Sequence, residues 1–180
     1  MHKFFLMGVA ALALSACSEK GADADGDGKI SDAEASTEMT TGGAMAMKPG
    51  LWEVRVNYDK VEAPGVPADM LAKMKAQIAQ GMTQRSCLTQ AQVDKPGMEF
   101  FGAAPEANCT FNTLDRSSDG VKIEMTCKPS GPIVVKSKMD GKFGAQTYTM
   151  NIEQSTEGTP MGPVKMVGKI EGKRVGECPA

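Results

Sequence analysis

The sequence predicts an α+β fold: a curved antiparallel β-meander of about six strands, with one amphipathic Met-rich helix packed on it, braced by disulfides and preceded by a flexible stalk. Three observations predict this fold. Apolar and polar residues alternate with period two in several segments after residue 48, which is typical of strands with one wet face. One segment has helical spacing instead, and four cysteines are spread along the same region.

The N-terminus has the form of a bacterial lipoprotein signal. A charged start is followed by an apolar run over residues 4–14, too short to span a bilayer, and then by Leu14-Ser-Ala-Cys17, which resembles a lipobox. In such signals residues 1–16 are removed and the cysteine is lipidated, so we expect Cys17 to anchor the chain to a membrane. Ser18 in the next position indicates the periplasmic face of the outer membrane. The alternative is a secreted protein with a chance cysteine.

Residues 23–34 fit the EF-hand calcium loop position by position. Calcium prefers oxygen ligands, and this loop supplies them from positions 1, 3, 5, 7, 9 and 12. Those positions are Asp23, Asp25, Asp27, the Lys29 carbonyl, Ser31 and Glu34. Gly28 stands at position 6, where the loop must turn sharply. The sequence therefore predicts one calcium site, and the alternative is a solvated acidic spacer.

A helix is predicted on only one side of this loop. Too few residues follow Cys17 for an entering helix, whereas Ser31 and Glu34 form a capping box that predicts a short helix from Asp32. A second EF-hand loop, with which Ile30 would share an apolar contact, is absent from the sequence. We therefore expect weak binding, with a Kd of about 10⁻⁴ to 10⁻³ M.

Residues 35–48 are rich in Ala, Ser, Thr, Gly and Met with little pattern, which indicates a tether. The predicted organisation is a signal peptide over residues 1–16, a lipid-anchored stalk with the calcium loop over residues 17–47, and an antiparallel β domain with one helix over residues 48–180. We expect the stalk to let the domain stand clear of the lipid surface.

Six segments of the domain carry the strand signal. In the first, Trp52, Val54, Val56 and Tyr58 alternate with polar residues. The strands are expected over residues 51–59, 108–114, 121–127, 133–139, 148–152 and 164–170. Turns are predicted at residues 117–120, 140–141 and 157–158, each of which contains glycine.

Residues 67–82 break the period and predict a helix. Its apolar residues form one stripe: Met70, Leu71, Met74, Ile78 and Met82. Pro67 suits the helix start, and we expect the stripe to lie against the apolar face of the sheet. A second, short helix is predicted after Thr89, where Gln92 completes a capping box.

The four cysteines of the domain are expected to form two disulfides, because an even count in an exported protein favours them. The hairpin of residues 108–127 brings Cys109 and Cys127 opposite each other to within about one residue. We therefore predict Cys109–Cys127 and, from the remaining pair, Cys87–Cys178. A metal site of four thiolates is the alternative, but the sequence has no C-x-x-C pair.

Several features occur together in this region: Pro-Gly-Leu-Trp-Glu53 leading a strand, a Met- and Gln-rich helix, Cys-Leu-Thr89, two central cysteines and a Gly-Glu-Cys178 ending. In this combination residues 48–180 resemble a family of small exported proteobacterial proteins known only as domain of unknown function 3617. The resemblance implies an exported, disulfide-bonded single domain without an established activity. It leaves out the calcium loop and the lipobox, and no functional residues carry over.

Composition argues against several functions. The net charge of −2 gives no reason to expect nucleic acid as a partner, and the only histidine, His2, lies in the signal. With no histidine, no free thiol and no G-x-S-x-G or S-x-x-K motif, we expect no enzyme activity.

The function predicted is therefore a cell-envelope lipoprotein that binds calcium, with a domain that binds an unidentified protein or apolar ligand. The main alternative is a periplasmic carrier or chaperone for an apolar ligand or lipid, enclosed between the sheet and the helix. A further alternative is copper binding at Met45 and Met47, although methionine is more often used to fill apolar cores. Another is a basic patch that binds anionic head groups. That patch would consist of Lys136, Lys138, Lys165 and Lys169.

Overall fold

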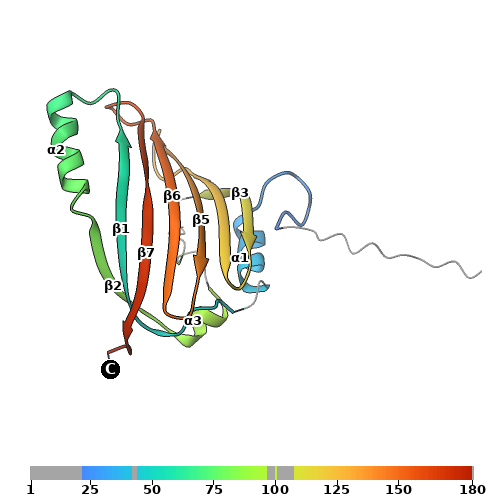
Figure 1. Ribbon diagram of the computed structural model, residues 1–180. Helices are drawn as coiled ribbons and strands as arrows, with labels where there is room; N and C mark the ends of the chain where they lie inside the picture. The colour runs from blue at the N-terminus through green and yellow to red at the C-terminus, as the bar shows by residue number, and fades with distance from the viewer. Residues whose placement is uncertain (1–21, 42–43, 97–99, 101–107, 180) are drawn as a thin grey trace, which may run out of the picture.

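The computed structural model describes residues 22–41, 44–96, 100 and 108–179 (Figure 1). It confirms the predicted fold class, with an open antiparallel sheet of seven strands and three short helices in the described part of the chain. The helices are α1 (Asp32–Thr41), α2 (Ala68–Ile78) and α3 (Gln90–Asp94). The strands are β1 (Gly50–Glu62), β2 (Met82–Leu88), β3 (Cys109–Arg116), β4 (Gly120–Cys127), β5 (Val134–Phe143), β6 (Thr147–Glu157) and β7 (Val164–Gly176).

The strand order is β2-β1-β7-β6-β5-β4-β3. Strands β3 to β7 form a meander of hairpins. Strand β1 pairs with β7, so that the first and last strands in the sequence are neighbours in the sheet. All six predicted strands form. The seventh, β2, was not predicted, because it lies at an edge and all its residues except Leu88 are exposed. A strand exposed on both faces needs no apolar alternation.

Two strand glycines make room for large side chains on the core face. Gly172 of β7 lies opposite Tyr148 of β6, and a Cβ atom at position 172 would stand 2.0 Å from Cε1 of the Tyr148 ring. Gly141 likewise leaves room for Met150. The Tyr148 ring packs against Trp52 with 5.7 Å between ring centroids, and burial raises the pKa of its phenol to about 12.

The core covers one face of the sheet and includes described residues of the segment predicted to be a flexible stalk. Ala35 and Met39 of α1 have no exposed surface, and Met45 and Met47 are each 4% exposed. They belong to the same apolar cluster as Trp52 of β1. The structure thus differs from the expected free stalk, because this segment supplies the layer that the apolar face requires. Burial of the two methionines in that layer also accounts for them without copper.

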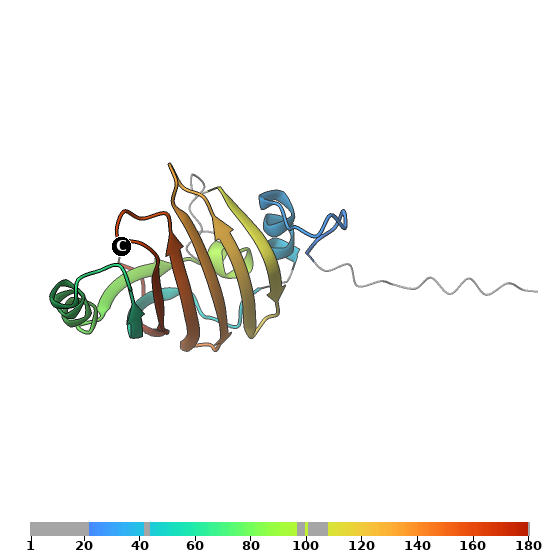
Figure 2. The same ribbon diagram turned by 90° about the horizontal axis from the view of Figure 1, so that it is seen from above.

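Polar contacts hold this segment in place. The Met45 N–H donates to the Val93 carbonyl of α3 at 3.0 Å, and the Arg116 guanidinium of β3 donates to the Met39 carbonyl at 2.9 Å. Figure 2 shows α1 beside β3 at one edge of the sheet and α2 beyond β1 at the other.

Helix α2 does not take the position predicted for it. It was expected over the apolar face, but that face is covered by α1, residues 45–47 and α3, and none of the residues of α2 is buried. Leu71, Met74 and Ile78 are half-buried, whereas Met70 is 49% exposed. The helix ends at Ile78, before the predicted end of the stripe, and Met82 is instead the first residue of β2 and 64% exposed. The short helix α3 forms with the predicted capping box of Thr89 and Gln92.

Both predicted disulfides form. Cys87 and Cys178 lie 5.4 Å apart between Cα atoms and tie β2 to the C-terminus. Cys109 and Cys127 are direct partners in the β3–β4 ladder. The β domain therefore has one disulfide at each edge strand of the sheet, β2 and β3.

The outer face of the sheet carries paired charges instead of a basic patch. Ion pairs join strand neighbours: Lys136–Glu157 (2.8 Å), Lys138–Glu124 (3.1 Å) and Lys165–Glu153 (2.7 Å). Alternating signs of this kind offer no concentrated positive field to an anionic surface. No helix of the described residues is both long enough and apolar enough to cross a membrane. The predicted signal peptide and Cys17 lie outside the described residues.

Candidate metal centre

The calcium loop predicted over residues 23–34 is docked on the edge of the sheet. Ile30 forms an isolated antiparallel bridge with Phe111 of β3. The Ile30 N–H donates to the Phe111 carbonyl at 2.9 Å, and the Phe111 N–H donates back at 3.2 Å. Ile30 is 6% exposed and Phe111 has no exposed surface. Strand β3 thus provides the pairing and the apolar contact that a second EF-hand loop would provide.

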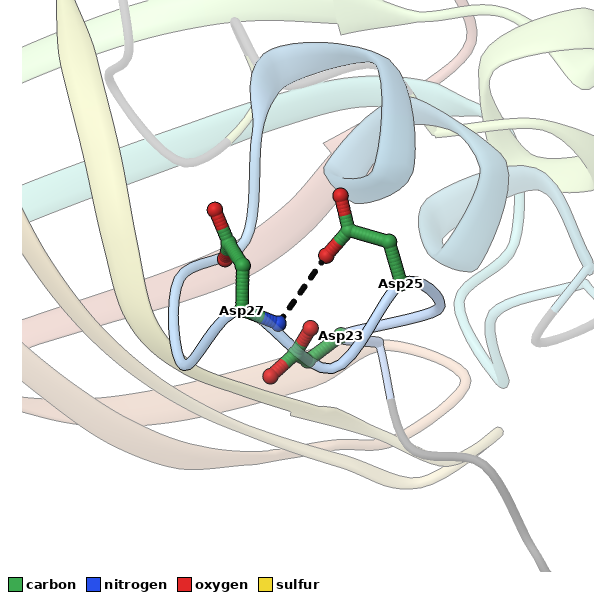
Figure 3. A group of neighbouring side chains, drawn as sticks. All are labelled: Asp23, Asp25 and Asp27. Carbon is green, nitrogen blue, oxygen red and sulfur yellow. Dashed lines mark hydrogen bonds between the residues drawn. The ribbon is translucent and has the colours of Figure 1, made fainter.

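Three of the predicted ligands come together in this loop. Asp23, Asp25 and Asp27 each offer a carboxylate oxygen, and these oxygens all lie within 4.8 Å of one another. Figure 3 shows the three side chains gathered around one turn of the loop, with the Asp27 N–H donating to Asp25 Oδ1 at 3.1 Å. Asp25 and Asp27 are exposed, whereas Asp23 is half-buried.

Two glycines shape the turn that gathers these carboxylates. Gly26 and Gly28 have φ angles of 77° and 80°, a left-handed conformation that glycine adopts without steric cost. Their N–H groups donate to the two oxygens of Asp23, at 2.7 Å from Gly26 and 3.0 Å from Gly28. The predicted turn at position 6 is therefore present, and the backbone N–H groups partly offset the repulsion among the carboxylates.

Glu34 closes the loop from its other end. Its Oε1 accepts hydrogen bonds from the N–H groups of Ala24 at 2.9 Å and Asp25 at 3.3 Å. Its Oε2 accepts from the N–H and the hydroxyl of Ser31, at 2.9 Å and 2.8 Å. Donation from the Ser31 backbone and then from its hydroxyl lowers the pKa of the Glu34 carboxyl, with smaller contributions from Ala24 and Asp25. Glu34 is therefore ionised at neutral pH.

Glu34 also takes part in the capping box that was predicted for it. The Ser31 hydroxyl accepts from the Glu34 N–H at 3.4 Å, which completes the capping box of α1. The helix begins at Asp32, as predicted. Glu34 lies outside the group of three clustered carboxylates, because its oxygens are engaged with the backbone of the loop.

The remaining predicted ligand is the carbonyl of Lys29. Lys29 is exposed, and its N–H donates to Asp27 Oδ1 at 2.8 Å, so the backbone at this position is drawn toward the cluster. Phe111 was not predicted as a partner of the loop. Its only signal was the apolar alternation of the β3 segment, which does not show that its edge pairs with a residue so far away in the chain.

The donor set of the loop suits a hard cation. Carboxylate, hydroxyl and carbonyl oxygens are the ligands that Ca²⁺ and Mg²⁺ prefer. A flexible loop with many oxygen donors favours Ca²⁺, because Mg²⁺ demands near-ideal octahedral geometry and keeps several of its waters.

Comparison with known proteins identifies the domain but leaves its activity open. The sequence model of a family described as "Protein of unknown function (DUF3617)" matches residues 47–178. Neither a curated protein nor a solved structure matches the chain. The match begins after the loop and α1, so both elements of the candidate centre lie outside it. Because the match covers most of the sequence and includes every strand, the chain belongs to the DUF3617 family.

Proposed function

We propose that this protein binds one Ca²⁺ ion in the loop of residues 23–34. The observation that carries the proposal is the cluster of Asp23, Asp25 and Asp27, whose carboxylate oxygens lie within 4.8 Å of one another on a docked loop. The ligands would be these three carboxylates, the Lys29 carbonyl, Ser31 and Glu34. Three negative charges held this close repel one another, and a divalent cation converts that repulsion into attraction.

The docked loop changes the affinity that we expect. Ile30 is already paired with Phe111, so binding does not have to order the loop from a free chain, which favours affinity. Glu34, however, must give up its hydrogen bonds from the N–H groups of Ala24 and Asp25 in order to bind the cation. This loss lowers the affinity. We expect a Kd of about 10⁻⁴ M, within the range of extracellular modules and far weaker than cytosolic buffers.

This affinity suits the location proposed for the protein, a bacterial cell envelope with Cys17 lipidated on the periplasmic face of the outer membrane. The support for this location is the lipobox-like Leu14-Ser-Ala-Cys17. Ala22, the first residue that the structure describes, is already buried, with 8% of its surface exposed. Five residues of extended chain span at most about 18 Å. An anchor at Cys17 would therefore hold the calcium loop close to the lipid surface.

Calorimetric titration of the purified protein with Ca²⁺ tests the proposal. We expect one site per chain, and Asp25→Asn should weaken binding at least about tenfold, because ligand charge sets the affinity of such loops. Asp69→Asn is the matched control: it removes a carboxylate from exposed α2 and should leave the Kd unchanged. Absence of any binding heat at several millimolar Ca²⁺ would refute the proposal, and equal weakening by both variants would show that only net charge matters.

A further inference from the structure

A groove lies between α2 and the ends of the strands at the far edge of the sheet from the calcium loop. Its volume is about 600 Å³, within the usual range for small-molecule sites. Most of its lining is apolar: Val61 of β1, Ala63 and Pro64 just after that strand, Leu71 of α2, Pro163 just before β7, and Val164 of β7. A neighbouring hollow of about 340 Å³ shares Val61, Glu62 and Lys75 with it and reaches Ile78. Together they run along the side of α2 that faces β1.

Helix α2 turns its apolar stripe toward this groove. Leu71 lines the larger hollow and Ile78 the smaller one. With Met74 they are the half-buried residues of the helix, and none of its residues is fully buried. The main apolar face of the sheet, by contrast, is filled by α1, α3 and residues 45–47. The groove is thus a place where the apolar side of α2 is only partly covered: Val61 and Ala63 are buried at its floor, whereas Leu71 and Val164 are half-buried.

The charges around the groove are balanced in number, but one of the cations differs from the rest in its pairing. Four charged residues line it: Glu62, Lys75, Glu157 and Lys165. Three of them are engaged in ion pairs with other residues: Glu62–Lys60 (2.8 Å), Glu157–Lys136 (2.8 Å) and Lys165–Glu153 (2.7 Å). Within the described part of the chain, no carboxylate lies within ion-pair distance of the Lys75 amino group. The charge of Lys75 helps to lower the pKa of the Glu62 carboxyl after the larger effect of Lys60, but Lys75 makes no ion pair among the described residues. It is therefore the cation at the groove that is left to pair with an added negative charge.

We propose that the groove under α2 binds a single-chain amphiphile with a carboxylate head, such as a long-chain fatty acid. The alkyl chain would lie along Val61, Leu71 and Val164, and the carboxylate would pair with Lys75. Lys75 follows Leu71 by four residues, so it stands one helical turn away on the same side of α2. This site is separate from the calcium loop and does not depend on it.

The first test is calorimetric titration of the purified protein with monomeric dodecanoate in a buffer that contains a calcium chelator. We expect one site per chain. Each methylene group buried contributes about fourfold in affinity, so decanoate, which has two fewer, should bind about fifteenfold more weakly than dodecanoate. Dodecanol, which has the same chain and no charge, should also bind more weakly. Equal affinity for dodecanol would overturn the assignment of the head group, and absence of dodecanoate binding would overturn the site.

Variants of α2 locate the ligand. Lys75→Glu should weaken dodecanoate binding at least about threefold, since it replaces attraction by repulsion, and Leu71→Gln should weaken it about tenfold. The matched control is Lys73→Glu, which makes the same charge change on the same helix but does not line the groove. Circular dichroism confirms that each variant is folded. Equal weakening by Lys73→Glu, or binding to phosphatidylglycerol vesicles without binding of dodecanoate, would overturn the proposal.

Discussion

Calcium bound to the loop should stabilise the whole domain and not the loop alone. The reason lies in the packing. Ile30, Ala35 and Met39 belong to the same core cluster as Trp52 and the strands, so the loop and α1 cannot leave the sheet without opening that core. A ligand that binds only the folded loop must then shift the unfolding equilibrium of the domain.

The magnitude follows from the affinity proposed above. With a Kd of about 10⁻⁴ M, 10 mM free Ca²⁺ stands about 100-fold above the Kd, which corresponds to about 2.7 kcal/mol of added stability. For a chain of this size 1 kcal/mol shifts the midpoint of thermal unfolding by about 2–4 °C. The Tm should therefore rise by about 5–10 °C.

Thermal unfolding followed by circular dichroism, with the disulfides intact, measures this shift. The wild-type protein is compared in 10 mM CaCl₂, in chelator, and in NaCl of equal ionic strength, which corrects for screening of surface charges. Asp25→Asn should show little calcium-dependent shift. If calorimetry detects calcium binding while the wild-type Tm moves no more than that of Asp25→Asn, the loop binds calcium independently of the sheet and the reasoning fails.

Three further outcomes follow from single contacts. Phe111→Ala should lower the free energy of unfolding, measured in urea, by about 3–5 kcal/mol, because Phe111 has no exposed surface, and the same variant should weaken calcium binding. Gly172→Ala should cost about 1–3 kcal/mol in the same assay, since its Cβ would stand 2.0 Å from the Tyr148 ring. The pKa of Glu34 lies below its usual 4.5, so the hydrogen bonds of its carboxylate are complete above that value and are lost as the pH falls through the lowered pKa. The protection of the Ala24 amide against exchange, measured relative to the intrinsic exchange rate at each pH, should therefore fall in acid, and Glu34→Gln should remove this pH dependence.

The strands could be predicted because burial of one face of a sheet makes apolar and polar residues alternate along each strand. Every strand from β3 to β7 places apolar residues on the core face, and the alternation records that constraint directly. The pairing of Cys109 with Cys127 followed from the same hairpin. Strand β2 lacks this signal. Its residues are held by backbone pairing to β1 and by the disulfide of Cys87, neither of which leaves a periodic pattern.

The covering of the sheet could not be predicted, because periodicity shows that a face is apolar but not which segment covers it. The stripe of α2 is the stronger helical pattern, yet α2 lies at the edge. The weaker segment fills the core through Ala35 and Met39, one helical turn apart, and through Met45 and Met47, two residues apart in an extended chain. Both spacings were present in the sequence, but among small and polar residues they resembled a tether.

The bridge between Ile30 and Phe111 explains how a single loop of this kind can be held in shape. An edge strand presents unpaired N–H and C=O groups, and β3 uses those of Phe111 to pair with Ile30. The loop gains the backbone partner that one EF-hand loop alone would lack, and the edge of β3 is covered where it would otherwise be open to another chain. The family match begins at residue 47, whereas the core of this chain also requires Met39 and Met45. The loop and its helix are therefore structural parts of this domain, and a cation bound at Asp23, Asp25 and Asp27 would act on the fold through the Ile30 contact.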